Sequence, residues 1–430
     1  MSLIALLGFG TVVLLAMLLL HSYLWWRLVR NTTGPGRLRR VLTLLTLVLA
    51  LLPALAIGLR RTLTLDAAAP LDWVAYSWLG IAFYAFLALL VLEPLRLIGN
   101  LLIRRRRRRP VEASGAGRVS RSLDETAPAD GGTAPGSGAV REDGGVVASP
   151  ARRVFLARTL AVTAGAVAVA TAGTGAYLAN GPPVVRRVPI TLSGLDPALD
   201  GLRIVTFSDA HLSATYRGRR FERLVELVNE QRPDVVAIVG DLVDGEVDEL
   251  REDVAPLADL VSSRGVYFVT GNHEYFVDTR AWLRHLPTLG IDVLHNERVA
   301  IGESGASFDL AGIDDRTAAG SGVPGQGADL GAALDGRDDR SPLVLLAHQP
   351  VMVEQARTAG VDLQLSGHTH GGQLWPFDYA IRLDQPAVEG LSRHGDTQLY
   401  VTSGAGYWGP PMRVGARPEV TVVELRAPRI

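Results

Sequence analysis

The chain has 430 residues, which exceeds the length of one ordinary domain. Its 43 basic and 44 acidic residues nearly cancel, so the net charge gives no reason to expect a nucleic-acid partner. Cysteine is absent, which excludes disulfides, thiolate metal ligands and cysteine nucleophiles.

Three long apolar runs open the chain, at residues 3–26, 41–59 and 73–92. Each approaches or exceeds the roughly 20 residues that a helix needs to cross the hydrocarbon core of a bilayer. The first run could be read as a signal peptide, but it lacks a basic start and a small-residue cleavage site, which favours an uncleaved helix. We therefore predict that residues 1–109 form a transmembrane region of three helices.

Arginines mark the ends of these runs. Several lie between residues 27 and 40, and an uninterrupted arginine block covers residues 104–109. Loops rich in Lys and Arg stay in the cytoplasm, so both segments are expected inside. RNA binding by the arginine block is the weaker alternative, because such a block beside a membrane helix typically sets topology. Residues 110–152 are rich in Gly, Ala, Pro, Ser and Asp and are expected to form a disordered cytoplasmic linker.

A fourth apolar run, residues 159–179, consists mainly of Ala, Val, Gly and Thr. Arg152 and Arg153, followed one residue later by Phe-Leu, resemble a twin-arginine export signal directly before this run. We predict a fourth transmembrane helix over residues 153–181, with a buried helix of a soluble domain as the alternative. Four crossings with the arginines inside place both the N-terminus and residues 182–430 outside the cytoplasm.

From residue 182 onward, short apolar runs alternate with amphipathic stretches. This alternation predicts strand–helix–strand units and a sheet with helices on both sides. The segment 314–340 is rich in Gly and Asp and is expected to be a mobile surface loop. The strands that we expect cover residues 202–207, 235–239, 266–269, 307–311, 343–346, 361–365, 398–402 and 419–425.

Five short polar motifs each follow an apolar run in this half. Taken singly, each is common, since Gly-Asp occurs in many turns and a His after a strand is often a packing residue. Together they supply carboxylate, imidazole and amide groups, which bind pairs of borderline divalent cations and suit phosphoester hydrolysis. The motifs are Asp209-Ala210-His211, Gly240-Asp241-Leu242-Val243-Asp244, Gly271-Asn272-His273-Glu274, Ala347-His348 and Gly367-His368-Thr369-His370.

On these motifs, residues 202–425 resemble the calcineurin-like metallophosphoesterase superfamily. The extended motif 367–373, with residues 403–406 and 409–413, further resembles the membrane-associated bacterial branch. Members of that branch carry an N-terminal anchor or a twin-arginine signal, whereas three extra helices are not part of the common pattern. The implied fold class is α/β: residues 182–430 form a metallophosphoesterase-type β-sandwich flanked by helices, preceded by an α-helical transmembrane region.

The resemblance also implies a site. Two divalent metal ions would share a hydroxide, and N/O ligands of this kind accept Mn, Fe, Zn, Co or Ni. The implied ligands are Asp209, His211 and His370 for the first metal, Asn272, His348 and His368 for the second, and Asp241 as a bridge.

Three further side chains are candidates for supporting roles. His273 would point to the substrate side as the general acid for the leaving oxygen. Asp244 and Glu274 are expected to orient ligating imidazoles, with ordinary turn or cap residues as the alternative. Trp375, Phe377, Tyr407 and Trp408 flank the last motifs and either line a substrate mouth, contact the membrane interface or belong to the core.

The predicted activity is that of a membrane-anchored binuclear-metal phosphohydrolase that cleaves phosphodiesters or phosphomonoesters with a metal-bridging hydroxide. Tethering beside a bilayer favours a lipid-linked phosphoester or another phosphoester of the cell envelope as substrate. One alternative is an extracytoplasmic nucleotide phosphatase. Another is a metal-dependent module that senses or binds phosphate without catalysis. The expected partners are the membrane and a phosphoester, and no nucleic acid.

Overall fold

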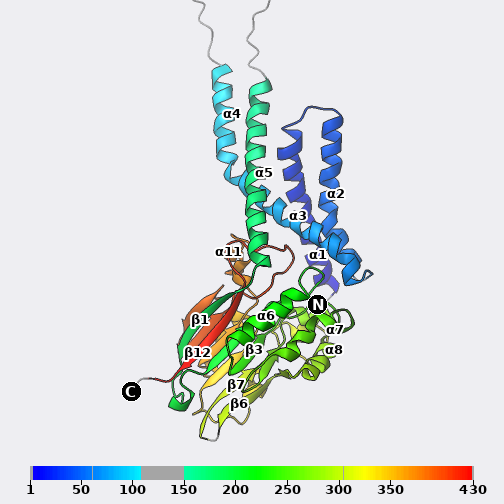
Figure 1. The fold of residues 1–430 in the computed structure, drawn as a ribbon. Helices are drawn as coiled ribbons and strands as arrows, with labels where there is room; N and C mark the ends of the chain where they lie inside the picture. The colour runs from blue at the N-terminus through cyan, green and yellow to red at the C-terminus, as the bar shows by residue number, and fades with distance from the viewer. Residues whose placement is uncertain (1–2, 61, 108–149, 304, 429–430) are drawn as a thin grey trace, which may run out of the picture.

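The computed structural model describes residues 3–60, 62–107, 150–303 and 305–428. Within these ranges the chain forms a group of long helices standing on a domain of two β-sheets (Figure 1). Residues 110–149 of the expected linker lie outside the described residues. Residues 150–152 already belong to a helix, so Arg152 and Arg153 lie in its first turn.

Among the described residues up to 180, the helical region has five α-helices, and four segments are long and apolar enough to cross a membrane, as the sequence predicted. The short helix α4 was not predicted as a separate element: it lies within the expected transmembrane region 1–109, after the third apolar run, and its last residues are arginines. Pro94 occupies its second position, where a missing N–H costs nothing. The elements are α1 (Leu3–Leu24) with the π-helix η1 (Trp25–Arg30), α2 (Arg37–Leu59), α3 (Leu65–Val91), α4 (Glu93–Arg107) and α5 (Pro150–Asn180).

Small side chains let α5 pack closely against α3. Ala164, Ala168 and Ala172 recur every four residues on one face of α5, and they are buried in a cluster with Ala82 and Ala85 of α3. Helices in membranes associate through such small-residue faces, because these faces bring two backbones into van der Waals contact. The mild hydrophobicity of the fourth run therefore reflects a packing face.

Two six-stranded sheets make up the domain, which confirms the predicted sandwich. All eight expected strands are present, and β1, β5, β6 and β10 are additional. The first sheet has the order β1 (Val184–Thr191), β12 (Glu419–Arg426), β2 (Arg203–Phe207), β3 (Val235–Val239), β4 (Val266–Val269), β5 (Asp292–Val293). The second has the order β10 (Gly390–His394), β11 (Thr397–Val401), β9 (Leu363–Ser366), β8 (Leu343–Leu346), β7 (Ala306–Gly312), β6 (Glu297–Glu303).

Short helices cover the outer faces of both sheets. The first sheet carries α6 (Arg219–Glu230), α7 (Val247–Val254) and α8 (Thr279–His285), and the second carries α9 (Leu330–Leu334) and α10 (Val353–Thr358). The helix α11 (Asp378–Ile381) lies beside the end of α5 (Figure 1). The 3₁₀ turns are η2 (Pro197–Leu199), η3 (Ala255–Asp259), η4 (His273–Phe276), η5 (Leu286–Leu289), η6 (Ala318–Gly320), η7 (Pro350–Met352) and η8 (His370–Gly372).

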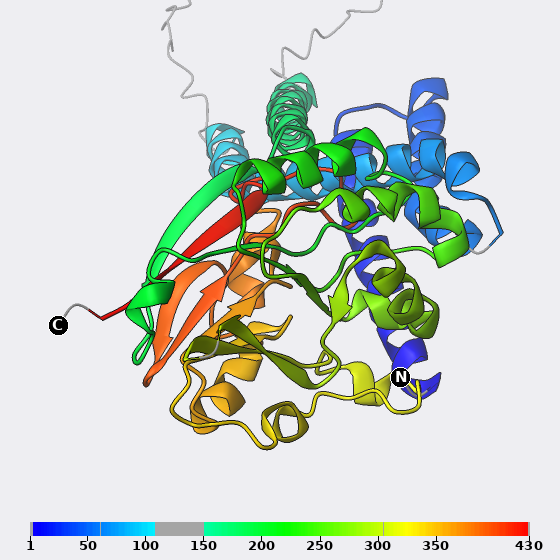
Figure 2. The same ribbon diagram turned by 60° about the horizontal axis from the view of Figure 1, so that its bottom comes forward.

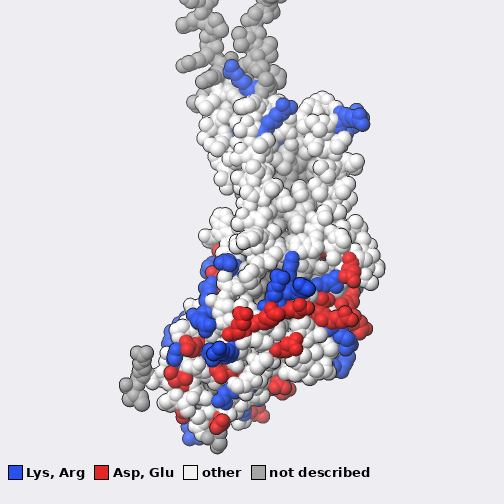
Figure 3. Space-filling view, in the orientation of Figure 1, with Lys and Arg blue, Asp and Glu red and all other residues white. Residues whose placement is uncertain are grey.

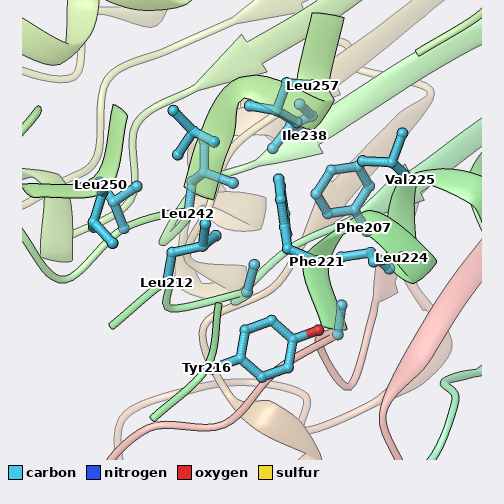
Figure 4. Packing of buried hydrophobic residues seen from close by; sticks show 14 of the residues in the cluster. Phe207, Leu212, Tyr216, Phe221, Leu224, Val225, Ile238, Leu242, Leu250 and Leu257 are labelled. Carbon is cyan, nitrogen blue, oxygen red and sulfur yellow. The ribbon is translucent and has the colours of Figure 1, made fainter. Parts of the chain in front are cut away.

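Alternation along the strands builds two hydrophobic layers. In β2, Ile204 packs between the two sheets, while Val205 and Phe207 face the helices. The helix-side layer includes Phe221 and Leu224 of α6 (Figure 4). Each fully buried side chain of this size contributes about 1.5–3 kcal/mol.

The segment 314–340, which we expected to be a mobile surface loop, has some regular structure. It contains η6 and α9, and its backbone is anchored: the N–H of Gly327 donates to Asp314 Oδ2 at 2.9 Å. The hydroxyl of Tyr275 donates to Gln326 Oε1 at 3.0 Å, which ties the segment to η4.

The helical region is docked on the domain. Leu65 and Ala68 of α3 and Ala179 of α5 belong to the same buried cluster as the residues of α6. The N–H of Arg413 donates to the carbonyl oxygen of Gly175 at 2.9 Å. A Cβ atom added at Gly175 would lie 2.6 Å from Val414 Cγ2, so only glycine allows this approach. The helices α3 and α5 therefore pack against the domain, in addition to connecting it to the membrane region.

We expect Gly175→Val to loosen this docking, because the new side chain has no room and overpacking typically costs about 1–3 kcal/mol. Thermal unfolding of the detergent-solubilised full chain measures the change. Gly173→Val is the matched control, because a Cβ atom there meets nothing within 4 Å in the same helix. Equal stability of the two variants would contradict the docking.

Candidate metal centre

The five motifs meet at one edge of the sandwich. Strands β2, β3 and β4 run parallel, and so do β7, β8, β9 and β11. Parallel strands bring their carboxyl ends to the same edge, where α/β folds place their sites. Asp209 follows β2, Asp241 follows β3, His348 follows β8 and His368 follows β9. Side chains far apart in the sequence thereby become neighbours.

The ligand set expected for the first metal is brought together. Single ligand atoms of Asp209, His211 and His370 all lie within 4.8 Å of one another, and all three residues are buried. His370 Nε2 is 3.3 Å from Asp209 Oδ1, and His211 Nε2 is 3.0 Å from His370 Nε2. This spacing suits one cation between them.

A second cluster contains Asp241, His348 and His368, again within 4.8 Å. His348 Nε2 is 3.1 Å from Asp241 Oδ2, and the same carboxylate oxygen is 3.8 Å from His211 Nε2 of the first set. Asp241 therefore lies between the two sets, as a bridging ligand must.

Asn272, the remaining expected ligand, supplies a test of whether the site suits a cation. Its Oδ1 atom is buried and has no hydrogen-bond partner among the described residues. An unpaired buried acceptor is costly, and native proteins rarely leave one without a compensating group. A divalent cation would satisfy this oxygen, so the residues present fit a two-metal centre.

Backbone conformation singles out the same residues. Of the eight described non-glycine residues with positive φ, five are expected ligands. Holding such a residue in this region costs about 1–3 kcal/mol and is typical of functional sites. The five are Asp209 (54°), His211 (50°), Asp241 (52°), His368 (71°) and His370 (52°).

Glu274 holds two of the ligand-bearing turns together. Its carboxylate accepts hydrogen bonds from the backbone N–H groups of Gly271 (2.6 Å), Asp241 (3.0 Å) and Leu242 (2.8 Å). We expected Glu274 to orient an imidazole, and it orients backbone instead. Gly240 allows the two turns to lie this close, because a Cβ atom there would lie 2.6 Å from the backbone nitrogen of Gly271.

Hydrogen bonds fix the ligating imidazoles. His348 Nδ1 is 2.7 Å from the carbonyl oxygen of Val239, which leaves Nε2 directed toward Asp241. His211 Nδ1 is 3.0 Å from Asp244 Oδ1, which leaves its Nε2 directed toward His370. Metal-binding histidines typically donate their second ring N–H in this way. Asp244 thus has the contact that we expected.

His273 lies at the open edge of the centre. Its side chain is 12% exposed, and its Nδ1 is 2.7 Å from the same Asp244 oxygen. The backbone N–H of His273 donates to Asp241 Oδ1 at 2.8 Å. The ring stands edge-on to Phe276 and Trp408, with centroid separations of 5.1 and 5.5 Å. Nε2 is therefore the ring atom available to a substrate.

The pKa values of the buried carboxyl and imidazole groups of the centre depend on one another. Burial alone would raise the pKa of Asp241, but the neighbouring imidazoles of His348 and His273 hold it well below its usual range. Burial would lower the pKa of His273, but the carboxylates of Asp241 and Asp244 raise it to about 9. Burial and the Asp241 charge raise the pKa of Glu274 to about 7.

Two arginines that we did not assign from the sequence contact this centre. Arg413 is fully buried, and its Nη1 donates to the carbonyl oxygens of His370 and Ser403, each at 2.6 Å. Burial lowers the pKa of Arg413 to about 10. Arg60, between α2 and α3, donates from Nη2 to the carbonyl oxygen of Asp244 at 2.9 Å. The helical region therefore contacts the turn that orients His211 and His273.

Comparison with known proteins agrees with this geometry. A model of the family described as calcineurin-like phosphoesterase matches residues 202–372. The chain is 41% identical over 286 residues to "Transmembrane protein with metallophosphoesterase domain" of Bos taurus, and the match covers 64% of each chain. It is 42% identical over 252 residues to the protein of the same name from Danio rerio, covering 57% of this chain and 58% of that one.

A bacterial relative is matched along nearly its whole length. The chain is 31% identical over 286 residues to "Uncharacterized metallophosphoesterase YkuE" of Bacillus subtilis, covering 64% of this chain and 98% of that one. By contrast, the chain spans about three fifths of the length of the two vertebrate relatives. A solved dimetal phosphatase from Danio rerio is 15% identical, with a TM-score of 0.30 over 48% of this chain and 88% of that one.

We expect Asp241→Asn to lower the bound metal of the purified chain, because the amide removes the charge that faces both ligand sets. Elemental mass spectrometry of the metal-loaded, dialysed chain measures the content. Asp314→Asn is the control, since Asp314 is equally buried but lies outside both sets. Two full metal equivalents in Asp241→Asn would contradict the bridging position.

Proposed function

Because the chain belongs to the calcineurin-like metallophosphoesterase family, we propose that it is a membrane-anchored phosphohydrolase that uses two divalent metal ions. The observation that carries this proposal is the meeting of both expected ligand sets around Asp241 at one edge of the sandwich. The resemblance of residues 367–373 and 409–413 supports placing the chain in the membrane-associated bacterial branch of the family.

The proposed metal sites divide the ligands as the motifs implied. When bound, two divalent cations such as Mn, Fe, Zn, Co or Ni would activate water and stabilise the charge of the phosphoryl oxygens. The positive φ angles of five ligand residues support a functional site, because residues held in this region cluster where binding or catalysis requires them. The first site comprises Asp209, His211 and His370, the second Asn272, His348 and His368, and Asp241 serves both.

His273 is the proposed general acid. Its Nδ1 contacts Asp244, which fixes the ring and leaves Nε2 to donate a proton to the leaving oxygen. The exposed edge of the ring supports this role, because a substrate must reach it from solvent. Asp244 acts through two imidazoles and is a positioning residue.

We further propose that the domain lies outside the cytoplasm. The arginines of the 27–40 segment lie at the end of the helices far from the domain, and the helix face between that end and the domain is uncharged in Figure 3. The positive-inside rule puts that end in the cytoplasm. Arg60 lies at the opposite end of the helices, against the rule. Its hydrogen bond to the carbonyl oxygen of Asp244 gives this arginine a reason to lie beside the domain.

The purified full chain is expected to hydrolyse p-nitrophenyl phosphate or bis(p-nitrophenyl) phosphate in detergent. Chelation should remove the activity, and added Mn should restore it, because the ligand side chains alone offer no means of activating water. Metal-loaded chain that hydrolyses neither ester would contradict the proposed function.

We expect His273→Ala to slow turnover by roughly 10²–10⁴-fold for an alkyl leaving group. The loss should be much smaller for p-nitrophenyl esters, whose leaving group needs no proton. Steady-state rates on the two ester types measure the difference, with His394→Ala, which lies on β10 away from the centre, as control. Equal losses on both ester types would argue against an acid role.

Orientation can be tested in intact cells, because the natural chain has no cysteine. An impermeant maleimide should label Val261→Cys in the domain, which is 68% exposed. It should label Gly34→Cys, in the loop between the first two crossings, only after the cells are opened. The reverse pattern would put the domain in the cytoplasm.

A further inference from the structure

Exposed apolar side chains of the domain are concentrated in one place. Among the described residues from 182 onward, eight large hydrophobic side chains are exposed, and only Val261 and Leu391 lie elsewhere. We call the other six the aromatic rim. They are Phe276, Trp375, Phe377, Tyr379, Leu383 and Trp408.

The rim begins at the candidate acid. Phe276 and Trp408 are the two aromatic residues whose rings flank His273. Gln373, three residues after the ligand His370, holds Trp408 through two hydrogen bonds: its Nε2 donates to the Trp408 carbonyl oxygen at 2.8 Å, and its Oε1 accepts from the Trp408 N–H at 3.0 Å. A substrate that reaches His273 therefore passes apolar surface.

The other end of the rim lies where the helices meet the domain. The hydroxyl of Tyr84 in α3 donates to the carbonyl oxygen of Trp375 at 3.1 Å. Leu374, next to it, packs in the cluster formed by α3 and α5. In Figure 1 the helix α11, which lies between Phe377 and Leu383, stands near the end of α5, and Figure 2, in which the bottom of that view comes forward, shows the long helices behind the domain. The rim thus extends from the metal centre to the face of the domain against which α3 and α5 pack.

Six such side chains in contact with water would be unfavourable, and apolar patches of this kind mark interaction sites. Aromatic rings are enriched where a protein meets the headgroup layer of a bilayer, because an amphipathic ring satisfies both environments. The continuity of the rim with the helices selects the bilayer as its occupant over a soluble protein.

We propose that the aromatic rim lies in the headgroup layer and that the enzyme takes its substrate, a phosphoester of a membrane lipid, directly from that leaflet. This inference rests on the proposed phosphohydrolase function. Water adds to phosphorus and releases a proton, and the P–O bond to the leaving alcohol breaks. The leaving oxygen takes the proton of His273 Nε2, and His273 regains a proton from solvent. The lipid's hydrocarbon chains stay in the bilayer beside Trp408 and Phe377.

The location of the rim is measured without catalysis. Because the chain has no native cysteine, Phe377→Cys and Tyr379→Cys each carry one environment-sensitive fluorophore in the full chain, reconstituted in nanodiscs of phosphatidylcholine and phosphatidylglycerol. We expect blue-shifted emission that lipid-borne nitroxides quench. A label at Val261→Cys, before β4 at the opposite end of that strand from the centre, should keep the emission of a fluorophore in water.

Emission at 377 and 379 that matches the Val261→Cys label would overturn the proposal. So would shielding without lipid quenching, because a second copy or another protein would then cover the rim.

Substrate choice is measured with two diesters that share one leaving group, ethyl and hexadecyl p-nitrophenyl phosphate, in the same nanodiscs. We expect kcat/KM to favour the hexadecyl ester by about tenfold or more, because its chain buries apolar surface. The preference should fall in Phe377→Ser with Tyr379→Ser and persist in Phe155→Ser, an exposed aromatic of α5 outside the rim. Hydrolysis of both esters at equal efficiency would overturn the lipid inference alone. Hydrolysis of neither would refute the phosphohydrolase itself, while the fluorescence result would stand.

Discussion

One buried carboxylate fixes the geometry on which the centre depends. Glu274 accepts from the backbone of both the Asp241 turn and the Gly271 turn, so the two turns keep one relative position. Losing this acceptor would leave several buried N–H groups unpaired, each of which costs about 1–3 kcal/mol. Asp241 in turn lies between the two ligand sets and accepts from the N–H of His273.

Local pattern was enough to predict the sandwich strands and the meeting of the motifs. Buried parallel strands read as continuous apolar runs, and each motif stands at the carboxyl end of such a run, as Asp209 and His348 do. The strands that we missed include β1, whose valines and arginines come in pairs with no apolar–polar alternation, and β5, which is only two residues long. The ligand roles and the acid role of His273 stay predictions.

Contacts between distant parts of the chain could not be predicted in this way. Arg60 and Asp244 are 184 positions apart, and no periodicity relates them. The importance of Gly175 likewise depends on Val414, a residue of the other region. Glu274 shows the same limit at short range: its type and place in the motif suggested an imidazole partner, whereas the fold presents it with backbone N–H groups. Such pairings exist only after the chain has folded.

The short connection between α5 and β1 limits how far the enzyme can reach. Only residues 181–183 separate the two elements, and three residues span roughly 10–11 Å at most. With α5 across the bilayer as proposed, the start of β1 stays at the lipid surface, and the pairing of β1 with β12 attaches the first sheet to it. Phosphoesters held farther from the membrane than the domain extends are out of its reach, so any such compound would have to diffuse to the membrane.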